Sequence, residues 1–393
     1  MPKADLSAYK GREQAYVKHC LLEKYLAPLA YKVGFAWGSF VYIDGFSGPW
    51  QTTRQDYSDS SFGVAVDTLR QVRRGMQQTW GRDLPVHIIL VEQDGRAFAA
   101  LEKFAANSSS VGFTIHPIRG EFVSSIPKIN RVVRKHTVNP FRFVFLDPEG
   151  WADIPMKALQ PFLRDRSCEV LINLMTRHII RFLDEENRAE SYEKLFGRRG
   201  VLDSLRKVPK GAERTEQAVR EYCRSLKDLC DFSYVSSAVI FEPDQESIRY
   251  FLVYGTNHSR GIEVFKEAET VTSHTQDLVR HGARTATSGQ DEWDFGDAAV
   301  KSRLTYKLRE RYTHRARAKV LELLRRSGSS GVLYSKLFCE AMAFPLVTPT
   351  DLQSWIETLV PNVRLVLAGS SRRKKPSPAQ DDRVIVMKRG KLM

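Results

Sequence analysis

The chain has 393 residues, 42% of them hydrophobic and 27% charged, a balance typical of a globular protein and not of a disordered one. It contains no apolar run of the roughly 18 residues that a membrane span needs, and its start lacks the apolar stretch of a secretory signal. The five cysteines show no Cys-x-x-Cys spacing, which disfavours a disulfide framework or a zinc site and predicts a reducing, cytoplasmic location.

The net charge of +14 is concentrated towards the C-terminal end of the chain. Residues 301–393 hold 20 Lys or Arg and 7 Asp or Glu. The 300 residues before them hold 40 Lys or Arg and 39 Asp or Glu, which nearly cancel. A nearly neutral body with a strongly basic final segment favours a polyanionic partner, and nucleic acid is the most general one. The alternative is a solvated basic surface that only aids solubility.

The body begins with a helix and a series of strands. Residues 18–29 show helical periodicity. This helix carries Lys18, His19 and Lys24, which either point towards a ligand or are solvated charges on a helix that only packs against the sheet. Apolar runs typical of buried parallel strands follow at 40–43, 87–91, 113–118, 140–146 and 169–174. Helical stretches such as 62–76 and 97–105 separate them, so the sequence predicts an α/β fold with a Rossmann-like, doubly wound, mostly parallel sheet.

The segment after the fifth strand predicts helices and one edge hairpin. Residues 178–229 are largely helical in pattern, and 232–241 and 250–254 predict two strands joined by a short polar turn. Residues 272–297 are mostly polar and predict a linker. The body is therefore expected to span 1–300, followed by a second, basic domain over 301–393.

The basic domain has the pattern of a winged helix. Helices are predicted at 315–326, 333–342 and 350–359, the first with Ala318, Leu321 and Leu324 facing inward, and strands at 363–368 and 384–387. Between these strands lies a basic tip that would contact phosphates and consists of Arg372, Arg373, Lys374 and Lys375. The third helix offers no base-reading Arg or Asn, so we expect binding to a nucleic-acid backbone, or a protein partner, more than sequence-specific readout.

Carboxylates follow four successive strands of the body. The carboxyl ends of parallel strands meet at one crevice, so these groups are expected to lie together. A ligand with ribose hydroxyls and amines would satisfy them, and S-adenosylmethionine has both, whereas the absence of a Gly-x-Gly-x-x-Gly or P-loop pattern disfavours dinucleotides and ATP. The predicted S-adenosylmethionine site comprises Asp44, Gly45, Phe46, Gly48, Glu92 and Glu121.

The fourth carboxylate predicts the place of a methyl acceptor. Asp147 and Pro148 end the strand at 140–146, and a carboxylate there can accept hydrogen bonds from an amine and orient its lone pair. Glu149 completes the predicted catalytic set. The alternative is an ordinary strand-ending turn.

Six stretches of the body form a recognisable combination: Lys18-His19, Lys24-Tyr25-Leu26, 42–49, 145–150, 171–173 and 255–258. Together they resemble the three-Cys-motif partner protein family, TcmP. The resemblance covers roughly residues 18–265 and implies a Rossmann-like fold similar to class I methyltransferases, a bacterial setting, and a partner protein that carries three cysteines. Two positions depart from methyltransferase patterns: Trp50 stands where a glycine would admit the cofactor, and Glu149 cannot stack on a flipped base.

Three functions remain open from the sequence. The first is an S-adenosylmethionine-dependent methyltransferase acting on nucleic acid. The second is a non-catalytic adaptor with a methyltransferase-like body. The third is a nuclease with Mg²⁺ held by Asp44, Asp147 and Glu149. Asn257 and His258 could assist any of these chemistries or simply cap the edge hairpin.

Overall fold

The computed structural model describes residues 6–48, 52–150, 153–185, 187–288, 302–360, 362–369 and 373–387. Its body is built on a seven-stranded sheet with the strand order β3-β2-β1-β4-β5-β7-β6. Strands β1 to β5 are parallel, and β7 runs antiparallel to both β5 and β6. The strands are β1 Ser39–Asp44, β2 Val86–Glu92, β3 Phe113–Arg119, β4 Pro140–Leu146, β5 Cys168–Leu174, β6 Tyr234–Phe241 and β7 Ile248–Thr256.

This sheet confirms the predicted α/β, doubly wound architecture. Every residue of β1 and β5 is buried, which explains why the centres of both strands are apolar without a two-residue alternation. The first five strands follow the 3-2-1-4-5 order of a Rossmann-like sheet, in which the crevice outside the carboxyl ends of the strands is the usual ligand site.

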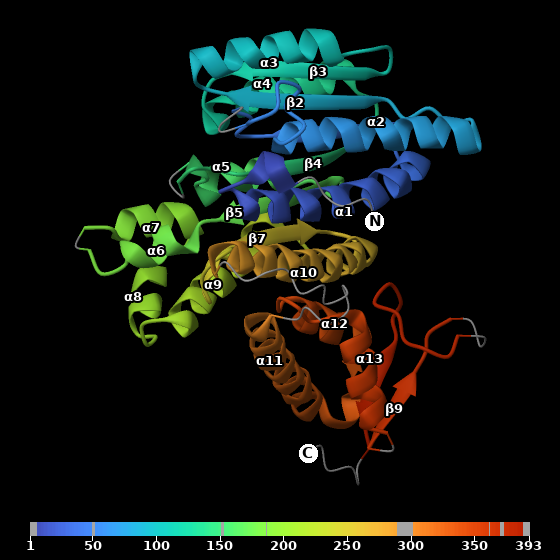
Figure 1. The fold of residues 1–393 in the computed structure, drawn as a ribbon. Helices are drawn as coiled ribbons and strands as arrows, with labels where there is room; N and C mark the ends of the chain where they lie inside the picture. The colour runs from blue at the N-terminus through green and yellow to red at the C-terminus, as the bar shows by residue number, and fades with distance from the viewer. Residues whose placement is uncertain are drawn as a thin grey trace.

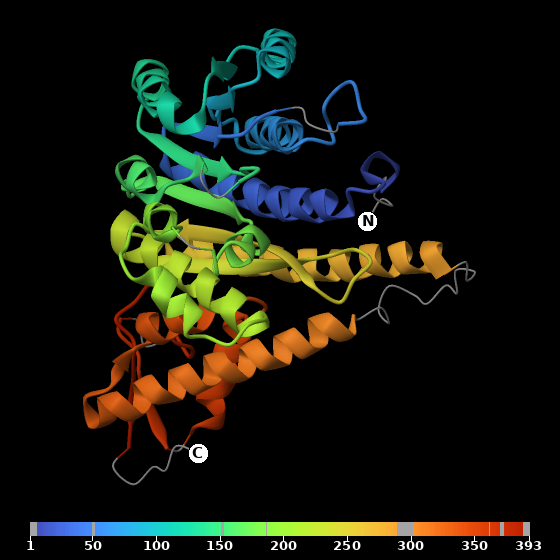
Figure 2. The same ribbon diagram turned by 90° about the vertical axis from the view of Figure 1, so that its left-hand side faces the viewer.

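Helices cover both faces of the sheet (Figures 1 and 2). On one face α1 (Glu13–Ala36) packs between α2 (Ser61–Trp80) and α10 (Ser259–Ser288). On the other, α5 (Met156–Leu163) contacts α4 (Phe122–His136) and α9 (Ala212–Cys230). The remaining elements of the body are the 3-10 turn Leu6–Tyr9, α3 Gly95–Ser108, α6 Thr176–Arg181, α7 Ala189–Phe196 and α8 Val201–Arg206.

The prediction of a linker from residue 272 is wrong, because α10 continues to Ser288. Several of its polar residues are buried, and two of them are hydrogen-bonded to the β6–β7 turn region. Gln276 accepts from the backbone N–H of Phe241 at 2.8 Å, and the Arg280 guanidinium donates to the backbone oxygen of Glu242 at 3.0 Å. A polar pattern therefore marks a helix face that pairs with the β6–β7 turn. Residues 289–297 of the predicted linker lie outside the described residues.

The basic C-terminal unit contains three helices and a small antiparallel sheet with the order β8-β10-β9. The predicted pairing of two final strands is confirmed by the antiparallel contact between β9 and β10. The first helix begins earlier than predicted, and Ala318 on it is exposed, because Tyr312, Ala316, Val320 and Leu324 form its buried face. The elements are α11 Arg303–Ser327, a 3-10 turn Gly328–Ser330, β8 Val332–Leu333, α12 Tyr334–Met342, α13 Pro349–Thr358, β9 Val363–Val366 and β10 Arg383–Val386.

Buried polar contacts attach this unit to the body. Glu216 on α9 is 4% exposed and is paired with Arg311 and Arg315 of α11. On α10, the Lys266 ammonium donates to Glu269 at 2.9 Å and to the backbone oxygen of Phe344 at 2.6 Å. The two units thus share a packed boundary. Within the described residues, no helix is long and apolar enough to cross a membrane.

Candidate functional site

The predicted carboxylates lie at one edge of the sheet. Asp44 and Glu92 end the neighbouring strands β1 and β2, and Asp147 follows β4 on the other side of β1. Glu121 follows β3, one strand further out, where it is exposed at the start of α4 and makes no side-chain capping bond. Three of the predicted carboxylates therefore lie on adjacent strands at this edge, and Glu121 lies at its margin.

Asp44 stabilises the local structure at this edge of the sheet. The residue is fully buried, its Oδ1 accepts from the Phe46 N–H at 3.0 Å, and its Oδ2 accepts from the Ser61 hydroxyl at 2.9 Å. Burial raises the pKa of Asp44 to about 6 in spite of these hydrogen bonds, and the nearby Asp147 adds to the rise. Asp44 thus fixes the turn after β1 and the start of α2, and its contacts are made within the protein.

The turn that Asp44 holds leads to the end of β2. The Ser47 N–H donates to the backbone oxygen of Val91 at 2.9 Å, so the turn after β1 lies against the end of β2. A Cβ at Gly45 would lie 2.7 Å from Leu146 and 2.9 Å from Phe122, so protein packing requires glycine there. Phe46 packs against Phe122 with ring centroids 5.7 Å apart, which makes it a wall of the turn.

Glu92 is the carboxylate best placed for a cofactor ribose. It is 4% exposed, and its Oε1 accepts from the Asp94 N–H at 2.6 Å. Burial raises its pKa, with additional contributions from the nearby Asp94 and Glu149. A buried acid at the end of β2, next to a small-residue turn after β1, has the chemistry and the placement that binding of ribose hydroxyls requires. These residues fit an adenosine-bearing cofactor.

Asp147 lies in a network of three side chains from three elements. One oxygen contacts the ammonium of Lys18 from α1, and the other accepts from the Asn173 amide of β5 at 2.6 Å. Burial alone would raise the pKa of Asp147, but the charge of Lys18 and the hydrogen bonds from Lys18 and Asn173 outweigh it and hold the pKa below its usual value. Asp147 is therefore ionised at neutral pH.

The Asn173 carbonyl oxygen is unusual within the described residues, because it is buried and has no hydrogen-bond partner. Its amide nitrogen is engaged with Asp147, so the free acceptor and the carboxylate lie side by side. A buried, unsatisfied acceptor at a ligand edge indicates a place for a donor. Pro148 is buried and Glu149 is exposed, so Glu149 is less enclosed than the predicted catalytic role required.

Sequence reasoning missed Asn173 and left Lys18 undecided. The chain offered one signal for Asn173, a polar residue between the apolar Ile172 and Leu174 near the carboxyl end of a buried strand. His19 is buried, and its Nδ1 lies 3.0 Å from the Tyr9 hydroxyl, so its ring contact is made within the protein. Lys24 lies near Glu23, at 3.4 Å, on the helix surface. Lys18 alone of the three contacts the candidate site.

The basic tip of the C-terminal unit is only partly available to a ligand. The Arg373 guanidinium donates to Asp382 at 2.7 Å and to the backbone oxygen of Ala368 at 2.6 Å, and Asp382 is fully buried. Arg373 therefore closes the loop between β9 and β10, and its predicted role as a phosphate contact stays a prediction. Lys374 and Lys375 are exposed, and Arg372 lies outside the described residues, as does Trp50.

Two further expectations can be compared with the geometry. Across the described residues, no group of three or more His, Cys, Asp or Glu is arranged to hold a metal ion, and the Lys18 ammonium contacts an oxygen of Asp147. The geometry therefore does not support the proposed Mg²⁺ set of Asp44, Asp147 and Glu149.

Asn257 accepts from the backbone N–H of Ser233 at 3.0 Å, so it caps the edge hairpin, as the structural alternative held.

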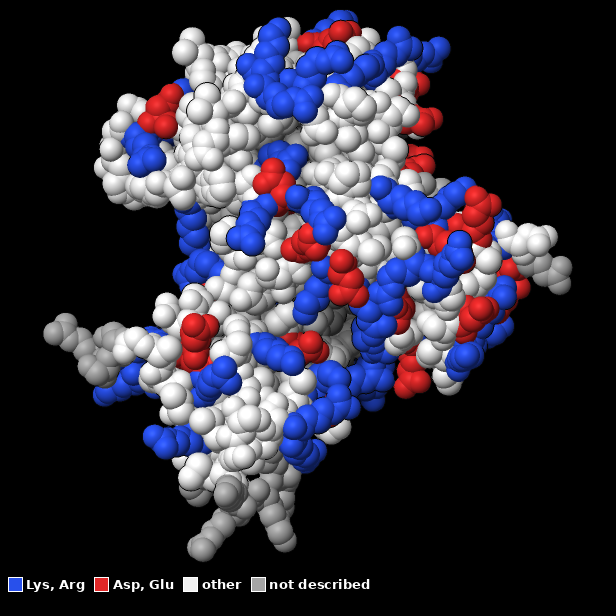
Figure 3. Space-filling view, turned by 180° about the vertical axis from the view of Figure 1, so that it is seen from behind, with Lys and Arg blue, Asp and Glu red and all other residues white. Residues whose placement is uncertain are grey.

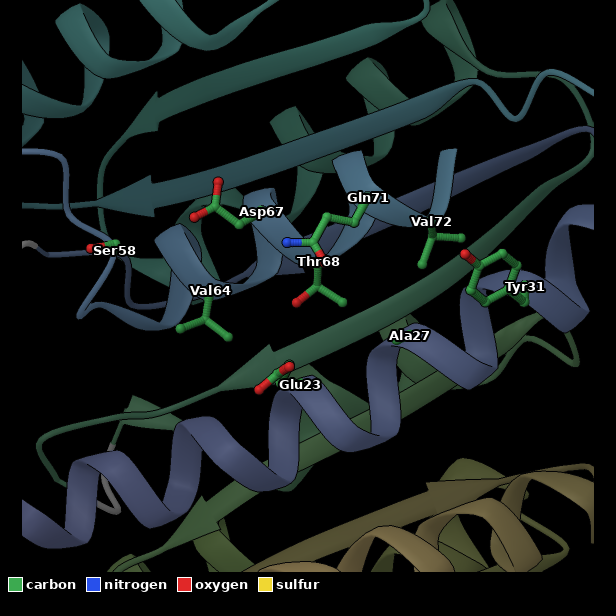
Figure 4. A pocket seen from close by; sticks show the side chains of 9 residues that line it. All are labelled: Glu23, Ala27, Tyr31, Ser58, Val64, Asp67, Thr68, Gln71 and Val72. Carbon is green, nitrogen blue, oxygen red and sulfur yellow. The ribbon is translucent and has the colours of Figure 1, made fainter. Parts of the chain in front are cut away.

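A small cavity of about 240 Å³ lies between α1 and α2 (Figure 4). Its lining includes Glu23, Tyr31, Asp67, Thr68 and Gln71. None of the strand-end residues lines it, so it is separate from the candidate site.

No protein-family model and no curated protein matches the chain. Three solved structures that it is similar to are methyltransferases. The first is a putative methyltransferase from Porphyromonas gingivalis W83, with 12% identity, 59% of this chain and 41% of that chain covered, and a TM-score of 0.26. The second is the O-methyltransferase from Bacillus cereus in complex with SAH, with 10% identity, 60% of this chain and 80% of that chain covered, and a TM-score of 0.31. The third is loganic acid methyltransferase with SAH, with 7% identity, 73% of this chain and 91% of that chain covered, and a TM-score of 0.26. The chain thus spans less than half of the first. At these TM-scores the likeness assigns no activity to this chain.

Proposed function

We propose that this protein is a class I, S-adenosylmethionine-dependent methyltransferase that acts on nucleic acid. The observation that carries the proposal is at the carboxyl edge of the sheet, where the Asp147 carboxylate accepts from the Asn173 amide and the carbonyl oxygen of the same Asn173 has no hydrogen-bond partner. The topology supports it: an antiparallel β7 inserted between β5 and β6 is the arrangement of class I methyltransferases. The sequence resemblance to TcmP is consistent with this class, and membership of that family is part of the proposal.

Glu92 would hold the cofactor through the ribose hydroxyls, with the Gly48 turn beside it and Glu121 at the outer margin near the adenine. Asp44 would act indirectly, because it fixes the turn, while Gly45 and Phe46 would shape its wall. S-adenosylmethionine, when bound, supplies a methyl group already activated by the sulfonium, so the protein needs mainly to position an acceptor.

The Asp147 site has the acceptors that an exocyclic amine of a base requires. Such an amine has two N–H groups, and the site offers a carboxylate oxygen and the Asn173 carbonyl oxygen side by side. Holding both N–H groups would direct the nitrogen lone pair out of the plane of the base, towards the methyl group. Lys18 would keep Asp147 ionised and fixed in orientation, and Pro148 would stiffen the turn that follows.

The C-terminal unit would hold the nucleic acid. Its three helices and three-stranded antiparallel sheet have the element order of a winged helix, and Lys374 and Lys375 remain exposed at the tip. A three-Cys-motif protein is a second proposed partner, and the cytoplasm the proposed location.

The test is methyl transfer from tritium-labelled S-adenosylmethionine to pools of DNA and RNA. Wild type is expected to label one pool, and Asp147→Asn to lower the rate by about 100-fold or more, as loss of a group aimed at the reacting centre does. Glu149→Gln is the matched control, because Glu149 is exposed, and it should retain activity. Absence of label in both pools, with cofactor bound, would contradict a nucleic-acid acceptor.

The adaptor alternative is favoured by one contact, because Lys18 already occupies an oxygen of Asp147. It predicts nucleic-acid binding without cofactor binding. Calorimetric detection of S-adenosylmethionine binding would exclude it.

A further inference from the structure

A second, larger cavity of about 660 Å³ lies at the boundary between the two units. Its walls come from α6, the first turn of α9, the β6–β7 turn and α11. We call it the interunit cleft and define it by its polar rim, which consists of Thr176, Arg177, Arg181, Thr215, Lys307 and Arg311. On the face shown in Figure 3, Lys and Arg side chains lie on both units along their common boundary.

The rim of the interunit cleft is strongly cationic. Four of the residues that line it carry a positive charge, and the one carboxylate among the described lining residues, Glu246, is paired with Arg280 at 3.2 Å. Arg181 and Lys307 make no ion pair with any described carboxylate; Arg181 only lies over the Phe182 ring. These two charges are therefore available to an anion.

The other two cations are only partly neutralised. Arg177 shares the buried Glu242 with Arg249, and Arg311 shares the buried Glu216 with Arg315, so each carboxylate faces two guanidinium groups. The Nε of Arg311 is buried and has no hydrogen-bond partner among the described residues. A buried charged donor without a partner costs stability unless a ligand supplies an acceptor.

The rest of the lining suits a nucleotide strand. Hydroxyls of Thr176 and Thr215 can donate to phosphate, and α9 begins here without a side-chain cap. The floor is aliphatic and includes Ile180, Ile248 and Leu308, against which sugars and base edges can pack. The volume of the interunit cleft lies in the range of clefts that hold one small ligand, which is too small for a duplex.

The interunit cleft adjoins the candidate site. Its wall α6 begins at Thr176, three residues after Asn173 in β5. The Asn173 amide also lies 3.6 Å from the Met175 sulfur in the connection between them. A nucleic-acid strand bound along α6 would therefore extend towards Asp147.

By contrast, the small cavity between α1 and α2 is lined by the carboxylates Glu23 and Asp67 and repels a polyanion.

We propose that the interunit cleft binds the sugar–phosphate backbone of single-stranded nucleic acid and presents one base to Asp147. This inference rests on the proposed function for the identity of the polyanion, and it assigns the principal contact to Arg181 and Lys307 rather than to the β9–β10 tip. A single strand fits because an amine on a base reaches a pocket only when the base is unstacked.

The test is fluorescence anisotropy of a labelled single-stranded oligonucleotide with the full chain, over about 50 to 200 mM salt. The double variant Arg181→Ala/Lys307→Ala is expected to weaken binding at least tenfold and to lower the slope of log K against log salt by about 1.4, the value for two lost phosphate contacts on a single strand. Arg134→Ala/Lys135→Ala on α4 removes the same charge from exposed positions and should bind as wild type does.

A third variant, Lys374→Ala/Lys375→Ala, separates the two proposals. If it alone loses affinity, the interunit cleft is not the binding site, although the proposed function stands. If wild type binds neither single-stranded nor duplex nucleic acid, the proposed nucleic-acid function fails. Equal slopes for the cleft variant and wild type, or tighter binding of wild type to duplex than to single strand, would overturn the inference. Circular dichroism of each variant confirms folding.

Discussion

The ammonium of Lys18 in α1 contacts the carboxylate of Asp147 after β4, across 129 residues of sequence. The pair joins the helix layer to the edge of the sheet where ligands bind in this fold. With Asn173 on the other oxygen of Asp147, it fixes both the charge and the orientation of that carboxylate. The proposed acceptor site is therefore assembled by three distant segments, and each can be changed separately.

Removing the cation should change how activity depends on pH. In Lys18→Met, the charge that holds the pKa of Asp147 below its usual value is lost, so burial raises this pKa. The acid limb of the profile of kcat/KM against pH is therefore expected to move to higher pH, with a lower maximum. Lys24→Met, on the same helix but paired with Glu23, is the control. An unchanged acid limb would show that Asp147 is not the ionising group.

Asp44 should make the protein less stable as pH rises through the mildly acidic range. Its pKa is raised from 3.8 to about 6, so the folded state holds a proton that the unfolded state releases above pH 4. Stability is then lost as pH rises from about 4 to about 6, by roughly 3 kcal/mol. Asp44→Asn lacks this titration. Urea unfolding at pH 4 and pH 7 should show a smaller loss for the variant, and parallel losses would contradict the assignment.

Three neighbouring imidazoles from β2, β3 and α4 predict a loss of stability in acid. Burial lowers the pKa of His116 to about 4, assisted by the neighbouring His87 and His136. His87 Nδ1 lies 3.2 Å from His116 Nε2. Because the folded pKa is depressed, the stability contribution is complete above about pH 6.5 and is lost as pH falls towards 4. His116→Gln should flatten the fall in melting temperature over this range, whereas the exposed His314→Gln should follow wild type.

The loop between β9 and β10 should depend on a single buried carboxylate. Asp382 accepts from Arg373 and from the backbone N–H groups of Ala368 and Ser377, each of these two at 2.7 Å. Asp382→Ala leaves these donors without an acceptor, so amide exchange in β9 and β10 should accelerate by roughly tenfold or more. Its neighbour Asp381 is exposed, and Asp381→Ala should have no such effect. Equal exchange rates in the two variants would contradict the role of Asp382.

The sheet and its edge could be predicted from the sequence because both depend on local patterns. Apolar runs in β1 and β5 are buried on both faces, and the polar residues that end β1 and β2 mark the carboxyl edge directly. Asp44, Glu92 and Asp147 follow from this pattern alone. Their individual roles do not, because only the hydrogen bonds distinguish the structural Asp44 from the more available Glu92.

The features that were missed depend on contacts between distant segments. Lys18 has the same local context as Lys24, and only the packing of α1 against the sheet separates them. The second half of α10 has a polar sequence because its buried side chains, such as Gln276, pair with the β6–β7 turn. Arg373 belongs to a basic run that is typical of an exposed tip, yet the buried Asp382 holds it.

The most direct measurement of the central claim is isothermal calorimetry of S-adenosylmethionine with wild type, Glu92→Gln and Glu121→Gln. The carboxyl edge of the sheet is predicted to bind the cofactor, with affinity at least tenfold weaker in Glu92→Gln, because a buried acceptor for the ribose is lost. Glu121→Gln should have a smaller effect, since Glu121 is exposed at the margin. No heat of binding for wild type, or equal affinity for wild type and Glu92→Gln, would contradict the account.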